Sequence, residues 1–210
     1  MENIKILIIL TLVSIIFLIR THKKGKKSES LSFLSTMIAT LFGVLVAITL
    51  STIEDKKKER NDTIKLLNSG LEVLKVTYAF TNQFGKQDID IEQDSSEDED
   101  DQKYRRLHNP LPYPDLLVTI IENETVSKNI SQETLLQISA ELINAQNRGN
   151  YDDIIEYKET LKSLFFWIKV EIAHLQGKIS VEEIKSQDKL KIQDKLKIDF
   201  IEIGIGANVE

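Results

Sequence analysis

The longest apolar stretch of the chain runs from Ser30 to Ile53 and carries no charged residue. A helix over this range is long enough to cross a hydrocarbon core of about 30 Å. From Glu54 onwards the chain mixes charged and apolar residues in amphipathic patterns. We therefore predict a membrane-spanning helix over about 30–53, followed by a water-soluble part.

An earlier apolar stretch, Ile4–Ile19, is interrupted only by Lys5, whose long side chain can reach the membrane surface. A cleaved signal peptide has a similar apolar core, but it requires small residues at a cleavage site. The basic segment Arg20–Lys27 follows instead and contains no such site. The pattern favours an uncleaved first span over about 4–19, so residues 1–53 are predicted to form a two-helix transmembrane hairpin.

Small residues recur at every fourth position of the second span, at Ser35, Ala39, Gly43, Ala47 and Ser51. Such a face allows two helices to approach closely in lipid, where close packing rather than the hydrophobic effect holds helices together. Small residues are also a normal part of membrane helices. The stripe is therefore interpreted either as a helix–helix contact face or as ordinary composition.

Residues 54–85 are predicted to continue the second span into water as an amphipathic juxtamembrane helix, because no helix breaker interrupts its start. Apolar residues then recur at steps of three and four: Ile64, Leu67, Leu71, Leu74 and Tyr78. This spacing is typical of a helix in a bundle or a coiled coil, and we expect it to prolong a contact between copies. Gly70 weakens the helix by about 1 kcal/mol relative to alanine, and Gly85 is the expected stop.

Residues 86–103 are predicted to be a disordered acidic linker. They contain nine acidic residues between Asp88 and Asp101, with no basic residue among them. Like charges repel, and the segment has too little apolar surface to fold. A calcium-binding EF-hand loop is the alternative, but the glycine that its pattern requires is missing.

The segment 104–210 is predicted to be a small helical soluble domain, entered through an arm with three prolines. Helices are expected over Pro114–Asn123, from Ser131, over Tyr151–Gln176 and from Ser180. Ser131 and Asn150 are good N-caps, Ser180 and Glu183 match a capping box, and Gly177 ends the longest helix. That helix carries the apolar stripe Leu161, Phe165, Ile168, Ile172 and Leu175.

The tail repeats one hexapeptide, QDKLKI, over 187–192 and 193–198. A period of six matches no helical repeat, and the apolar residues alternate through Ile203 and Ile205. This alternation is compatible with a short strand after Asp199, and a duplication that lengthens a polar helix is equally compatible. The fold class is thus all-α, with the short C-terminal strand left open.

The composition excludes several chemistries. There is no cysteine, so disulfides, thiol catalysis and cysteine-ligated metals are absent, and a net charge of −6 argues against a nucleic-acid partner. His22, His108 and His174 lie far apart, and Glu171 with His174 lacks the second E-x-x-H that a bundle metal site requires. No phosphate loop or hydrolase motif is present. We predict that the protein is not an enzyme and has no cofactor.

The span motif A-T-x-x-G-V-L-V-A from Ala39 to Ala47, followed by EDKKKER and the leucine stripe, lies within Thr36–Leu74. This arrangement resembles uncharacterised bacterial two-span membrane proteins, some of which are labelled phage abortive-infection proteins. The resemblance implies a bacterial inner-membrane protein with its soluble domain in the cytoplasm. Lys and Arg are almost equally frequent on both flanks of the second span, so the positive-inside rule does not decide the orientation.

Two functions remain open. The first is a membrane-anchored, non-enzymatic interaction or signalling protein that forms a homo-oligomer through its second span and juxtamembrane helix, and that binds an unknown protein partner. The alternative is an anti-phage defence effector whose soluble domain senses a signal and whose spans then permeabilise the lipid bilayer.

Overall fold

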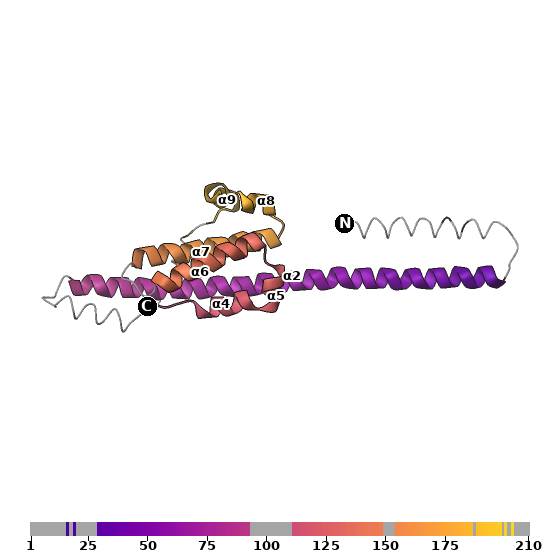
Figure 1. Ribbon diagram of the computed structural model, residues 1–210, viewed down its shortest axis with the longest axis horizontal. Coiled ribbons are helices and arrows are strands. Elements are labelled where there is room, and N and C mark those ends of the chain that lie inside the picture. Colours follow the sequence, from indigo (N-terminus) through magenta and orange to yellow (C-terminus); the bar gives the residue numbers. More distant parts are fainter. Residues whose placement is uncertain are drawn as a thin grey trace. The chain divides into compact units, whose positions relative to one another are not determined.

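The computed structural model describes residues 16, 19, 29–92, 111–148, 154–186, 188–198, 200 and 203, without the side chains at 29–31, 33–34 and 84–92. Every regular element within these residues is a helix, which confirms the all-α prediction for this part of the chain (Figure 1). Apart from Ile16 and Ile19, the predicted first span lies outside the described residues, so the hairpin stays a prediction. The chain divides into two compact units, Met1–Lys58 and Glu59–Glu210.

In the first unit, the described structure is the beginning of α2, a helix that runs over Glu29–Glu92. This part of α2 is long and apolar enough to cross a membrane. Its large apolar side chains are exposed, with Leu41 at 64% and Ile48 at 58% of full exposure. These exposed side chains can be buried by lipid, by a second protein surface or by a part of the chain outside the described residues.

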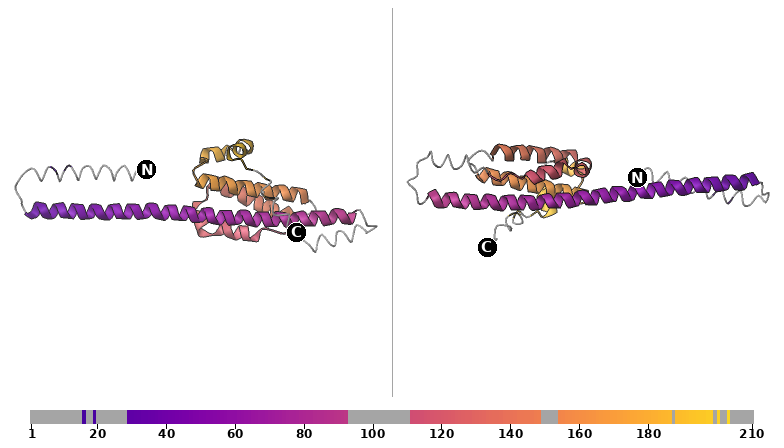
Figure 2. Two further views of the ribbon diagram at one scale, coloured as in Figure 1. Left: turned by 180° about the vertical axis from the view of Figure 1, so that it is seen from behind. Right: turned by 90° about the horizontal axis from the view of Figure 1, so that it is seen from below.

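The second unit is a bundle of α2 from Glu59 onwards with the later helices. These are α4 (Asp115–Glu122), α5 (Glu124–Asn129), α6 (Gln132–Arg148) and α7 (Ile154–Leu175). The ribbon views show α4 and α5 along one side of α2, and α6 and α7 along another (Figures 1 and 2). The sequence pattern assigned residues 54–85 to a segment of their own, whereas from Glu59 they belong to the same compact unit as the later helices.

The leucines of α2 form the centre of this bundle. Leu67, Leu71 and Leu74 are almost completely buried in one cluster with side chains of α4 and α7, such as Leu117 and Phe165. Burying each leucine contributes about 1.5–3 kcal/mol relative to leaving it in water. The stripe therefore packs within the chain's own bundle, and it is not available to prolong a contact with a second copy.

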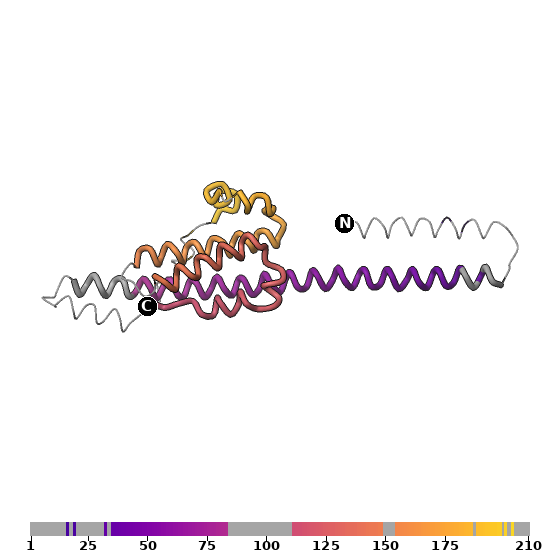
Figure 3. Tube along the Cα trace, in the orientation of Figure 1, coloured from indigo at the N-terminus to yellow at the C-terminus, as the bar shows by residue number. Residues whose placement is uncertain are grey.

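After α7, the described residues include the short helices α8 (Val181–Lys185) and α9 (Lys189–Leu196). Figure 3 traces the turn that leads to them, and α8 contacts α6 while α9 contacts α7. The turn is made by Gly177, whose φ of +74° places it in the left-handed region. The N–H of Lys178 then donates to the Ala173 carbonyl at 2.9 Å, which completes the predicted helix end.

The local start signals are also confirmed. Ser180 and Glu183 form the reciprocal hydrogen bonds of a capping box at α8. The Ser131 hydroxyl accepts a hydrogen bond from the Thr134 N–H at 3.3 Å, at the start of α6. α7 is described from Ile154, three residues after the predicted start, because residues 149–153 lie outside the described part.

The end of α2 differs from the sequence pattern. α2 continues past Gly85, the predicted stop, to Glu92, so the first residues of the predicted linker are helical and those from 93 to 103 lie outside the described residues. One glycine weakens a helix by only about 1 kcal/mol, and no proline follows before Pro110. Most of the hexapeptide repeat lies in α9, which supports the helical interpretation of the tail, and no strand occurs in the described part of the chain.

Candidate helix–helix contact site

The threonine hydroxyl groups in the apolar half of α2 form hydrogen bonds within the helix. Thr36, Thr40, Thr49 and Thr52 each donate their hydroxyl to the carbonyl four residues earlier, at 2.8–3.0 Å. Hydrogen bonds of this kind satisfy these four hydroxyl groups within the helix itself. A helix in lipid needs this property because the hydrocarbon core contains no water to satisfy such groups.

The predicted contact residues lie along this half of α2. Ser35 is half-exposed, while Ala39, Gly43, Ala47 and Ser51 are exposed. A Cβ atom added at Gly43 would meet no atom within 4 Å. Within the described residues, no other part of the chain fills the space in front of the stripe at its centre.

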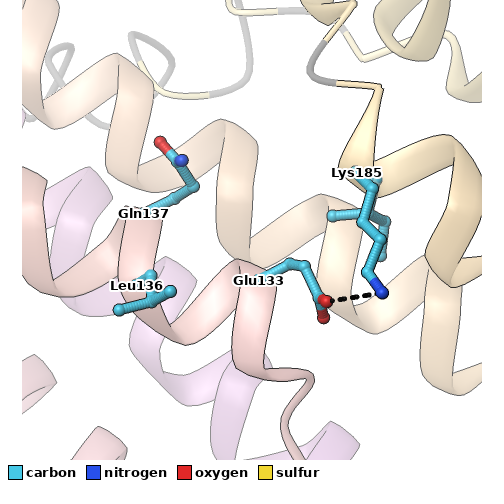
Figure 4. Close-up of a pocket in the computed structure, with 5 residues that line it drawn as sticks. Glu133, Leu136, Gln137 and Lys185 are labelled. Atoms are coloured by element: carbon cyan, nitrogen blue, oxygen red, sulfur yellow. Dashed lines mark ion pairs between the residues drawn. The ribbon is translucent and has the colours of Figure 1, made fainter.

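A small groove lies between α6 and α8 in the second unit, shown in Figure 4. Its lining residues are Glu133, Leu136, Gln137, Ile184 and Lys185, and its volume is about 120 Å³. Sites for small-molecule ligands have volumes of roughly 300–1,000 Å³. The groove is therefore of the size of a side chain rather than of a ligand.

An ion pair closes one end of this groove, where the Lys185 ammonium lies 3.2 Å from a Glu133 carboxylate oxygen. The pKa of Glu133 is lowered because its own backbone N–H, and then Lys185, donate hydrogen bonds to the carboxylate. α8 carries a second such pair between Glu183 and Lys195 of α9. The first pair links α8 to α6 of the bundle, and the second links α8 to α9.

The Glu171 and His174 side chains do not converge on a metal site. Glu171 is fully buried and accepts hydrogen bonds from the Ser131 N–H at 2.8 Å and the Ser131 hydroxyl at 2.6 Å. The His174 Nδ1 lies instead 3.1 Å from the Ile179 carbonyl oxygen. No group of three potential metal ligands occurs within the described residues, and His22 and His108 lie outside them.

The outer face of α6 was not predicted from the sequence. Leu136 and Ile143 are 62% and 58% exposed, although they belong to an amphipathic helix whose other apolar side is buried. Their spacing, with Ala140 between them, was a visible signal of a second apolar face. It was missed because the stripe through Ile138 and Leu142 already accounts for a core-facing helix.

No family model, no curated protein and no solved structure matches this chain. The function is therefore inferred from the surfaces of the molecule itself, namely the apolar half of α2 and the outside of the bundle.

Proposed function

We propose that this protein is a membrane-anchored, non-enzymatic interaction or signalling protein whose copies associate through the second span. The observation that carries the proposal is the contrast within one helix. In α2, side chains such as Leu41 are exposed, whereas Leu67, about seven turns later, is fully buried. An exposed apolar half that no described part of the chain covers has the properties of a membrane anchor, and the buried half holds the bundle to it.

In this proposal, the small residues from Ser35 to Ser51 form the contact between copies. A stripe that repeats every four residues drifts slowly around a helix with 3.6 residues per turn, so two stripes stay in contact if the helices cross. Gly43 lies at the centre of the stripe, where the two backbones would approach most closely. The open space in front of Gly43 is what such a contact needs.

The test is a pair of substitutions in the second span. We expect Gly43→Ile to weaken self-association in a membrane two-hybrid assay, because the larger side chain separates the helices. Leu45→Ile is the control, since Leu45 lies off the stripe and the substitution leaves the volume of its side chain unchanged. Equal signals from the two variants, or no signal from the parent chain, would show that the stripe is only the ordinary composition of a membrane helix.

The same cells distinguish this proposal from a pore-forming defence effector. A passive anchor leaves the membrane intact when the protein is induced, so a dye held in the cells stays inside. Toxicity on induction together with dye leakage would contradict the anchor and support permeabilisation by the spans.

A further inference from the structure

The outward face of α6 is uncharged. Every exposed residue from Gln132 to Asn147 is neutral, in a chain of which 29% is charged. At its centre are Leu136, Ala140 and Ile143, which follow one another at steps of four and three and so lie on one side of the helix. The buried Ile138 and Leu142 lie on the other side. α6 thus has an apolar stripe on each of two opposite faces.

The charges that α6 does carry are used within the chain. Glu133 pairs with Lys185 at 3.2 Å, and Arg148 pairs with Glu156 at 3.3 Å. Glu141 accepts a hydrogen bond from the Ser163 hydroxyl at 2.6 Å. All three lie at the margins of the face rather than on its exposed centre, so the centre is free of unpaired charge.

A depletion of charge at the centre, with paired charge at the rim, is the composition of a protein–protein interface. The side-chain-sized groove between α6 and α8 begins at Leu136, at one end of the stripe (Figure 4). A hollow of this size beside a protruding apolar side chain suits an equivalent side chain from a facing helix.

We propose that this face binds the same face of a second copy, as a parallel and in-register pair of α6 helices around Ala140. The proposal rests on the proposed self-association, because anchoring in one membrane keeps the copies close to one another. In an in-register pair each residue meets its own counterpart, so any charge would meet a like charge. A neutral face is the one surface that can pair in this way without repulsion.

The sequence of the stripe agrees with such a pair. Leu136, Ala140, Ile143 and Asn147 follow the spacing of alternating a and d positions in a short parallel coiled coil. The small Ala140 permits close approach at the centre, and an asparagine at one a position favours a single register. One helix pair buries less than the roughly 800 Å² per partner of a standard interface, so the pairing depends on tethering in the membrane.

The experiment uses disulfide cross-linking in the full chain, which has no cysteine of its own. In membranes treated with a mild oxidant, we expect Ala140→Cys to form a disulfide-linked dimer, because the pair places both thiols at the shared axis. Ser127→Cys on α5 is the control, since Ser127 is also exposed but lies on another helix. Adding Leu136→Glu to Ala140→Cys should reduce the cross-linked fraction about tenfold through like-charge repulsion.

The outcomes separate this inference from the anchor proposal. Cross-linking at Ala140→Cys no greater than at Ser127→Cys, or unaffected by Leu136→Glu, would overturn the α6 pair. If the two-hybrid signal of the parent chain persists in that case, self-association through the span still stands. A cross-link of Ala140→Cys to a different protein would also overturn the inference, because the face would then belong to another partner.

Discussion

At the scale of single residues, the buried carboxylate of Glu171 requires hydrogen-bond donors inside the bundle. It is fully buried, and both of its oxygens accept hydrogen bonds from Ser131, forty residues earlier in the chain. A buried carboxylate is tolerated only when such donors replace water. Ser131 also caps α6, so one contact joins the start of α6 to the last turns of α7.

We predict that Glu171→Ala lowers the free energy of unfolding by about 3 kcal/mol, because a cavity forms and the Ser131 donors lose their buried partner. Glu159→Ala is the control on the same helix. The Glu159 side chain is 62% exposed and pairs with Lys162, so its loss should change stability by less than about 1 kcal/mol. Thermal or urea unfolding of the detergent-solubilised chain measures the stability of both variants. Equal effects would contradict a stabilising role of the hydrogen bonds between Ser131 and Glu171.

At the scale of elements, α2 and α4 meet at Gly70. A Cβ atom at this position would lie 2.9 Å from the Leu117 Cδ1 atom, and Leu117 is itself fully buried. The glycine that weakens the helix in isolation therefore allows the two helices to pack closely. The penalty in helix propensity is offset by the contact that it permits.

We predict that Gly70→Leu destabilises the bundle by about 2–3 kcal/mol, because a buried leucine overpacks the contact with Leu117. Ser69→Leu adds the same side chain one residue earlier on an exposed position of α2, and it should stay within about 0.5 kcal/mol of the parent chain. Unfolding monitored by circular dichroism distinguishes the two. A similar stability for both variants would show that α4 can shift to make room for the larger side chain at this contact.

At the scale of the whole molecule, two compact units are joined within one continuous helix, with the boundary after Lys58. In the proposed anchor, the first unit contains the membrane segment and the second contains the bundle. The side of the membrane on which the bundle lies then decides which partners it can meet, and we expect that side to be the cytoplasm.

We predict that a reporter fused after residue 60 is in the cytoplasm, because two spans return the chain to the side of its N-terminus. A green fluorescent protein fused there should fluoresce, and alkaline phosphatase fused at the same residue should be inactive. Active phosphatase without fluorescence would place the bundle outside and would overturn the predicted sidedness.

The sequence by itself determined the features that depend on neighbouring residues. The charge-free stretch Ser30–Ile53 predicts a span by its length, and the helix signals at Ser131, Gly177 and Ser180 act through backbone groups within a few residues. The stripe from Leu161 to Leu175 correctly predicted the buried side of α7 for the same reason, since helical period alone places those side chains on one face.

Only the tertiary structure decided which surface covers each apolar face. Leu67 and Leu74 have the spacing of a coiled coil as much as of a bundle, and their burial within the chain's own bundle depends on helices more than forty residues away. The close contact at Gly70 and the pairing of Ser131 with Glu171 are equally non-local, and no local pattern encodes them. The exposure of the outer face of α6 is also decided by packing. Periodicity shows that the helix has two apolar sides, but only the packed structure shows which side the chain leaves uncovered.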